Sequence, residues 1–215
     1  LVGADGPTHA GSFDTTYLTT LPNFIVMAAS DEAELVRMIN TSTEINDRPC
    51  AFRYPRGTGL GSILPSINEK IEIGKSKIIK EGKKLAILNF GARLNETLKA
   101  AENLKKKGVS ITVVDARFAK PLDENLIWQL ATTHEAIMTI EEGSIGGFGS
   151  HVVNFLTKKG LMDSNLKFRS LTLPDIFIDQ DTPDKMYKVA NLDSVSIEEK
   201  VLDLLNSNIV LKKQN

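Results

Sequence analysis

A chain of 215 residues is long enough for one large or two small domains, each with a sizeable apolar core. Its net charge of −1 comes from interspersed acids and bases, which excludes a basic stripe for nucleic acid, and no apolar run is long enough to span a membrane. The single cysteine, Cys50, excludes an internal disulfide framework and argues against a zinc cluster. A hydrophobic content of 41% is ordinary for a soluble globular protein. Cytoplasm is the default expectation for the location.

The chain opens on LVGADGPTHAGSFDTTY, residues 1–17, without an initiator Met, a signal peptide or a polar lead-in. We therefore expect a fragment of a longer polypeptide. No hydrophobic period runs through this stretch, which predicts a loop, and its glycines and proline can define that loop tightly. Histidine titrates near neutral pH, so His9 is a candidate proton carrier. The alternative is that Asp5 and His9 only brace a turn.

The next segments alternate between strand and helix patterns. Residues 23–29 form an apolar run suited to a strand buried on both faces. Ser30, Asp31 and Glu32 supply a capping residue and two carboxylates for a helix that follows, and residues 49–54 predict the next strand, ended by Pro55. This β-α-β order predicts parallel strands.

Residues 57–70 hold three glycines, two serines and a proline, and they are the best linker candidate. A boundary near Leu64 divides the chain into domains at residues 1–64 and 65–215. The second domain is expected to have about five strands with helices on both faces. Its predicted strands are residues 71–80, 85–90, 111–114, 136–140 and 168–173. Its predicted helices begin at Asn95, Asp123 and Ser150, and two more end near Leu205, before a frayed tail at 206–215.

Several side chains are expected to be structural. Apolar patterns place Met27, Met38, Met138 and Trp128 in the core. His134 and His151 have no second ligand at metal spacing. The glycine-rich stretch from Glu141 to Ser150 could cradle phosphate, but its spacing is not that of a nucleotide-binding fingerprint, which favours a tight structural turn.

A set of motifs in a fixed order carries a resemblance over nearly the whole chain. The motifs are DGPTHAGSFD followed by YL, LPNFIVMAASDEAEL, RYPRG, GKKLAILNFG, VVDARFAKPLD, TIEEGSIGGFGS and LPDIFIDQ. Together they resemble the 1-deoxy-D-xylulose-5-phosphate synthase family, which belongs with the thiamine diphosphate-dependent transketolases. The resemblance implies an α/β protein in which the second half of a pyrimidine-binding-type parallel-sheet domain precedes a transketolase C-terminal-type domain.

The resemblance also implies an activity and its residues. This family condenses pyruvate with D-glyceraldehyde 3-phosphate, with loss of CO2, to give 1-deoxy-D-xylulose 5-phosphate for isoprenoid, thiamine and pyridoxal biosynthesis. It uses thiamine diphosphate and Mg²⁺ and works as a homodimer. His9 matches the histidine that lies over the thiamine and assists proton transfer. Asp5 matches the aspartate that accepts hydrogen bonds from the hydroxyls of glyceraldehyde 3-phosphate.

Two arginines complete the predicted site. Arg56 follows a strand and the strand-breaking Pro55, so its guanidinium can turn into a cleft and hold phosphate through paired hydrogen bonds. It matches the family's phosphate-binding arginine. Arg53 is the weaker substrate-binding candidate, because it can pair with a buried carboxylate instead. For both, a surface salt bridge is the alternative.

The family's diphosphate and magnesium motif, GDG followed by Asn, does not occur in this sequence, whose Asp-Gly pair is Asp5-Gly6. No cofactor or metal ligand is therefore assigned in this sequence. We expect most of the cofactor ligands upstream of Leu1, together with the cofactor-activating glutamate. The 215 residues alone are expected to be inactive. The alternatives are a transketolase, a 2-oxoacid dehydrogenase β-subunit-like enzyme, or a non-catalytic α/β module for dimerisation or docking.

Overall fold

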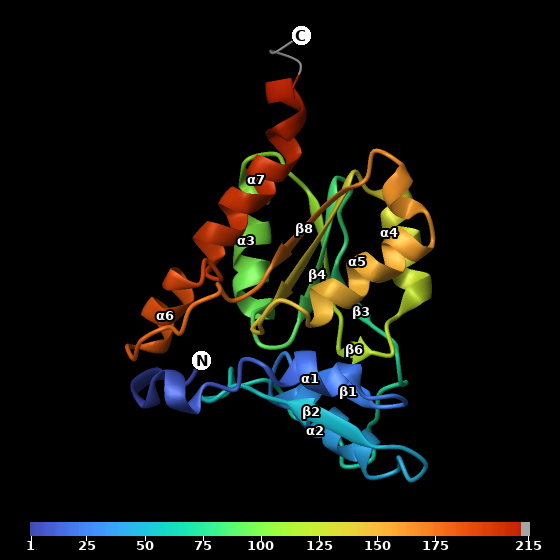
Figure 1. Ribbon diagram of the computed structural model, residues 1–215, viewed down its shortest axis with the longest axis vertical. Helices are drawn as coiled ribbons and strands as arrows, with labels where there is room; N and C mark the ends of the chain where they lie inside the picture. Colours follow the sequence, from blue (N-terminus) through green and yellow to red (C-terminus); the bar gives the residue numbers. More distant parts are fainter. Residues whose placement is uncertain (212–215) are drawn as a thin grey trace.

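The structure is a computed structural model that describes the backbone of residues 1–211 and the side chains of residues 1–206. Two sheets, one of three strands and one of five, lie one above the other with helices around them (Figure 1). The expected α/β class, with a pyrimidine-binding-type part before a C-terminal-type part, is confirmed.

The smaller sheet has the strand order β2-β1-β6. Its central strand, β1 (Ile25–Ala28), is buried on both faces, as its unbroken apolar run predicts. It pairs in parallel with β2 (Cys50–Arg53) and antiparallel with β6 (Phe118–Lys120). Helix α2 (Glu32–Ser42) connects the two parallel strands, and the side chain of Asp31 caps it by accepting a hydrogen bond from the Glu34 N–H at 2.7 Å.

The larger sheet has the strand order β3-β5-β4-β7-β8. Four of its strands run parallel, and the edge strand β3 runs antiparallel to β5. Strands β4, β5 and β7 are buried along their whole length, because helices cover both faces of the sheet. The bounds are β3 (Lys77–Lys80), β4 (Leu85–Phe90), β5 (Ile111–Asp115), β7 (Ala136–Glu141) and β8 (Lys167–Leu171).

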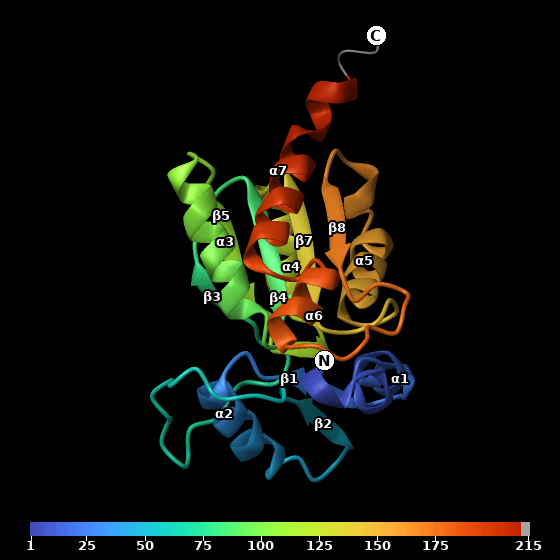
Figure 2. The ribbon, with the colours of Figure 1, turned by 90° about the vertical axis from the view of Figure 1, so that its left-hand side faces the viewer.

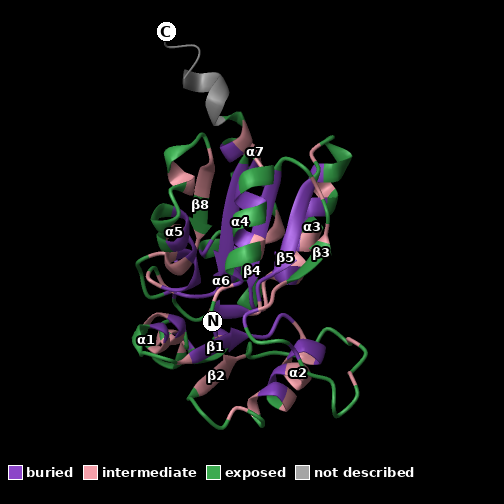
Figure 3. Ribbon diagram, turned by 90° about the vertical axis from the view of Figure 1, so that its right-hand side faces the viewer, coloured by how far each residue is buried: buried purple, intermediate pink, exposed green. Residues whose placement is uncertain are grey.

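The side chains of β4 point alternately to the two faces of the larger sheet, and each face has its own hydrophobic cluster. Leu85 and Ile87 face the cluster under α3 and α7, which lie side by side over one face of the sheet (Figure 2). Ala86 and Leu88 face the cluster under α4 and α5 on the other face, and the buried strands run between these layers (Figure 3). The helices are α3 (Leu94–Lys106), α4 (Glu124–Thr133), α5 (Phe148–Lys158), α6 (Pro183–Val189) and α7 (Ser194–Leu211).

Strand β6, which the sequence did not predict, ties the two sheets together. It follows β5 of the larger sheet after two residues, yet it pairs with β1 of the smaller sheet. Its Phe118 side chain is 1% exposed and packs in the cluster that holds Met27 and Met38. A boundary near Leu64 stays a prediction, and strand pairing crosses it.

Three predictions for the first half of the chain and α3 need correction. Residues 1–17 are not a loop throughout, because they contain the 3₁₀ turns Gly3–Asp5 and Pro7–His9 and the start of α1 (Asp14–Thr20). The strand predicted from residue 71 is confined to β3. Asn95 does not cap α3, since that helix already includes Leu94.

Further corrections concern the later elements. Helix α5 begins at Phe148 rather than Ser150, and β8 ends at Leu171. Helix α7 continues to Leu211, so the predicted frayed tail from residue 206 is wrong as far as residue 211, and residues 212–215 lie outside the described residues.

The core assignment of Met27, Met38 and Met138 is confirmed. Trp128 is not in the core, because its ring lies on the outer face of α4 and is 53% exposed. None of the helices described here has the length and apolarity needed to cross a bilayer.

Candidate functional site

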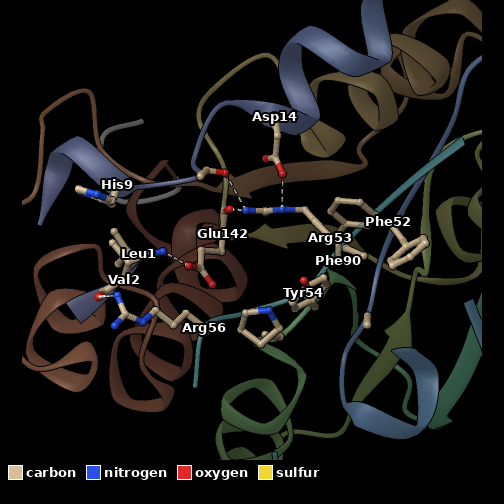
Figure 4. A pocket seen from close by; sticks show the side chains of 16 residues that line it. Leu1, Val2, His9, Asp14, Phe52, Arg53, Tyr54, Arg56, Phe90 and Glu142 are labelled. Atoms are coloured by element: carbon tan, nitrogen blue, oxygen red, sulfur yellow. Dashed lines mark hydrogen bonds and ion pairs between the residues drawn. The ribbon is translucent and has the colours of Figure 1, made fainter. Parts of the chain in front are cut away.

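A cavity of about 440 Å³ opens between the two sheets, where the carboxyl ends of β1, β2 and β4 meet (Figure 4). In α/β proteins this is the edge where ligands bind, because strand ends and loops leave an open crevice there. The cavity has an apolar wall and a polar rim. The wall includes Ala28, Ala29, Phe52, Tyr54, Pro55, Phe90 and Ala92, and the rim includes His9, Asp14, Arg53, Arg56 and Glu142.

His9 reaches the rim from the second of the two 3₁₀ turns. The turns are joined at Gly6, whose φ of +65° is unfavourable for other residues, and a Cβ there would lie 3.3 Å from Gln180. The imidazole is exposed, and its Nδ1 lies 2.9 Å from the hydroxyl of Thr8. Within the described residues, Nε2 of His9 has no protein partner, so it is available to a ligand.

Arg56 and Asp5, the predicted phosphate and hydroxyl ligands, lie together and form an ion pair with each other. The Arg56 guanidinium also donates to the main-chain oxygen of Val2 at 3.2 Å, and its side chain is 58% exposed. Arg56 lines the cavity, whereas Asp5 lies just outside the lining. The guanidinium is therefore open to an anion that enters from solvent.

Arg53 has a more enclosed environment. Its Nε donates to the Asp14 carboxylate at 3.0 Å, one terminal nitrogen donates to the carbonyl of Gly11 at 3.0 Å, and the other donates to the carbonyl of Glu142 (Figure 4). These three bonds connect the end of β2 to the loop before α1, to α1 itself and to the end of β7. Asp14 is a site residue that sequence reasoning missed, because the helix that begins there has no apolar period.

Glu142 lies in the stretch that the sequence analysis assigned to a structural turn, yet it lines the cavity. Its buried carboxylate accepts a hydrogen bond from the hydroxyl of Tyr187 at 2.9 Å. Burial raises the pKa of Tyr187, and the negative charge of Glu142 raises it further, so this tyrosine remains a hydrogen-bond donor. The Arg93 guanidinium lies 3.4 Å from the centroid of the Tyr187 ring.

The neighbouring glycine-rich turn has a structural role. Glu141 is buried, and its carboxylate accepts hydrogen bonds from the N–H groups of Phe148 and Gly149, both at 2.9 Å, at the start of α5. Burial raises the pKa of the Glu141 carboxyl, and these bonds partly offset that effect. A Cβ on Gly147 would lie 2.3 Å from the same carboxylate. The helix start is thus occupied by a residue of the chain itself.

The cavity supplies part of what thiamine diphosphate and Mg²⁺ require. Its apolar wall and His9 fit one side of an aromatic cofactor and a substrate. The described part of the chain contains no group of three or more His, Cys, Asp or Glu side chains that could hold a metal ion. His134, which bonds to Thr112 at 2.8 Å, has a structural position. The residues described here therefore do not fit the metal ion, and the location of the diphosphate ligands stays a prediction.

Comparison with known proteins agrees with this architecture. Residues 1–59 match the transketolase pyrimidine binding domain, and residues 74–197 match the transketolase C-terminal domain. A solved structure called "Split gene transketolase, inactive beta4 tetramer" superimposes with a TM-score of 0.81 at 26% sequence identity. The alignment covers 95% of this chain and 65% of that one. The chain belongs to the transketolase family, with pyrimidine-binding sequence followed by the C-terminal domain.

Proposed function

We propose that this chain forms the acceptor-substrate side of a 1-deoxy-D-xylulose-5-phosphate synthase. In the whole protein the reaction condenses pyruvate with D-glyceraldehyde 3-phosphate, releases CO2 and yields 1-deoxy-D-xylulose 5-phosphate for isoprenoid, thiamine and pyridoxal biosynthesis. The observation that carries this proposal is that His9 and an exposed Arg56 line one cavity at the carboxyl ends of parallel strands. The motifs DGPTHAG and RYPRG, which contain these residues, support the synthase over its relatives.

Arg56 binds the phosphate of the aldehyde substrate in this proposal. A guanidinium holds phosphate through two parallel, charge-assisted hydrogen bonds, and the exposed side chain leaves room for them. The Asp5 carboxylate beside it accepts hydrogen bonds from the substrate hydroxyls. These two contacts hold the phosphate and the C2 hydroxyl of the substrate and leave its aldehyde carbon without a protein ligand, so that carbon can point into the cavity.

His9 moves the proton. Condensation at the aldehyde carbon places negative charge on the carbonyl oxygen, and an imidazole at the rim can deliver a proton to it. Arg53 keeps the rim in place through its bonds to Gly11, Asp14 and Glu142, and it stays the weaker candidate for substrate binding. Bound thiamine diphosphate would supply the electron sink for decarboxylation, with its diphosphate and Mg²⁺ held by residues outside this chain.

The first test measures CO2 release from pyruvate by the full-length parent protein with thiamine diphosphate and Mg²⁺. Release that rises sharply on addition of glyceraldehyde 3-phosphate, with formation of a five-carbon phosphorylated ketose, is expected. Arg56→Ala should raise KM for the aldehyde about 10- to 100-fold, because it removes a charge-assisted bidentate contact. His9→Asn should lower kcat about 100-fold or more, because it removes the proton carrier. No response of the wild-type protein to the aldehyde would exclude the synthase.

A transketolase is the second candidate, because a structure of that name aligns with 95% of this chain. Transfer of a two-carbon unit from a ketose phosphate, without CO2 release, would establish it. In either case the 215 residues alone are expected to show no turnover, since the sequence lacks the GDG motif of the diphosphate site. If the full-length protein transfers its product to a lipoyl partner, a 2-oxoacid dehydrogenase β-subunit-like enzyme replaces the synthase and the transketolase as the proposed function. If the full-length protein binds no thiamine diphosphate, a non-catalytic docking module is favoured.

A further inference from the structure

We propose that Glu32 is a positioning residue that fixes the glycine-rich segment after β2 and thereby holds Arg56 over the cavity. This inference rests on the proposed function of Arg56 as the phosphate ligand. Glu32 is the first residue of α2 and lies outside the cavity lining, so it touches neither the substrate site nor His9.

The Glu32 carboxylate is surrounded by main-chain donors of one short segment. One of its oxygens accepts hydrogen bonds from the N–H groups of Gly61 at 2.5 Å and Ser62 at 2.9 Å. Its other oxygen accepts a bond from the N–H of Leu60 at 3.0 Å. The hydroxyl of Ser62 also donates to Asp31 at 2.9 Å. Three consecutive amides thus converge on one carboxylate, which is strong and specific anchoring for an exposed loop.

The segment needs such an anchor because of its composition. Gly57, Gly59 and Gly61 alternate along it, and glycine has more backbone freedom to lose than any other residue. Gly61 has a φ of +82°, in the left-handed region. A Cβ on Gly59 would lie 2.7 Å from the Glu32 carboxylate, so a side chain there would push the carboxylate out of its present position. The same glycines that permit the contact would leave the segment disordered without it.

Electrostatics favour the charged form of the anchor. Hydrogen bonds from the N–H group of Glu32 itself and from those of Leu60, Ser62 and Gly61 lower the pKa of the Glu32 carboxyl. Helix α2, which carries Glu32, is itself well fixed, because Asp31 caps it and its Met38 side chain is completely buried. The carboxylate is therefore a fixed negative group against which the segment is held.

Arg56 lies between two fixed points. On one side, Arg53 is held by bonds to Gly11, Asp14 and Glu142. On the other side, Leu60 is held by Glu32. Arg56 itself is exposed, and its polar partners among the described residues are Asp5 and the carbonyl of Val2, both in the segment that opens the chain. Loss of the second fixed point would leave its backbone free and add an ordering cost to phosphate binding.

The experiment compares Glu32→Ala with Glu124→Ala in the full-length parent protein. Glu124 is a matched control because it is the exposed first residue of α4 and follows Asp123, which caps that helix as Asp31 caps α2. Both variants lose the same helix-dipole interaction. Glu124 also has a long, exposed ion pair with Lys159 at 3.9 Å, which contributes little, and only Glu32 accepts hydrogen bonds from loop amides. Hydrogen exchange of the amides of residues 60–62 reports on the anchor, and calorimetry reports the Kd of glyceraldehyde 3-phosphate.

In Glu32→Ala we expect these amides to lose their protection and the Kd to rise about 5- to 20-fold, which is the cost of ordering a short loop on binding. Where turnover is measurable, KM should rise and kcat should change little. Glu32→Gln, which keeps one acceptor oxygen, should lie between, and Glu124→Ala should match the wild type. Unchanged exchange, or a Kd equal to that of the wild type, would overturn the inference. If the wild-type protein itself does not bind the aldehyde, the proposed function is refuted instead. Hydrogen exchange of the amides of residues 60–62 would still show whether Glu32 holds the loop.

Discussion

Arg53 and Arg56 lie three positions apart at the end of one strand, yet their guanidinium groups have different surroundings. Arg53 donates to three groups from three separate segments, whereas Arg56 is mostly exposed and pairs with Asp5. Their difference follows from the partners and not from the residue type. The sequence ranked Arg53 below Arg56 as a substrate ligand but could not identify its partners, because Asp14 and Glu142 reach Arg53 only through the tertiary fold.

Asp115 allows a test of burial at the scale of one carboxyl group. It lies at the end of β5, accepts a hydrogen bond from the Ser30 hydroxyl at 2.6 Å, and faces Glu34 and Arg117. Burial raises the pKa of this carboxyl from 3.8 to about 7, with the Ser30 bond and Arg117 opposing the shift and Glu34 adding to it. The folded state therefore binds the proton more tightly than the unfolded state.

We expect the stability of the wild type to fall relative to Asp115→Asn as the pH rises from about 4 to about 7, and to stay lower above that range. The reason is that the buried carboxylate must then be ionised, whereas asparagine is neutral throughout. The difference should reach about 2–4 kcal/mol in urea unfolding at the upper end. Asp203→Asn, an exposed change on α7, is the control and should show no such trend. A pH-independent difference for Asp115→Asn would contradict the expectation.

Close backbone approach sets the geometry of the turn between β3 and β4. Gly82 lies against the first residue of β5, where a Cβ would be 2.1 Å from the main-chain carbon of Ile111. Its N–H donates to the Thr112 hydroxyl at 3.0 Å. Gly82→Ala must therefore displace backbone and should cost about 2 kcal/mol or more in urea unfolding. Gly11→Ala is the control, because a Cβ there would meet no atom within 4 Å. Equal midpoints for the two variants would show that the turn can relax.

Elements with a strong hydrophobic pattern were predictable, and short elements fixed by tertiary contact were not. The run around Ile25–Ala28 and the strands β4, β5 and β7 were found because continuous apolar runs require burial on both faces. Strand β6 has three residues and no turn signal before it, and α1 has no apolar period, so neither pattern indicated an element. Trp128 fits a helical apolar stripe, but its position on α4 faces solvent.

At the scale of the molecule, we expect the two sheets to unfold cooperatively, because β6 joins them. Phe118→Ala removes a ring that is 1% exposed and should cost about 3–5 kcal/mol. Because the larger sheet supplies this strand to the smaller one, calorimetry of the wild type should show both sheets unfolding in a single transition. Phe118→Ala should lower its midpoint or separate it into two steps. Trp128→Ala, which removes an exposed ring, should change stability by less than about 1 kcal/mol. Two transitions in the wild type would contradict this account.

The origin of β6 also limits how the gene can be rearranged. A recombination event near Leu64 that exchanged everything after it for another C-terminal domain would remove the antiparallel neighbour of β1. The incoming domain would have to bring a matching β6 segment, including an apolar ring at the place of Phe118. Recombinant chimaeras that preserve the parental β6 segment should therefore yield soluble protein more often than chimaeras that replace it.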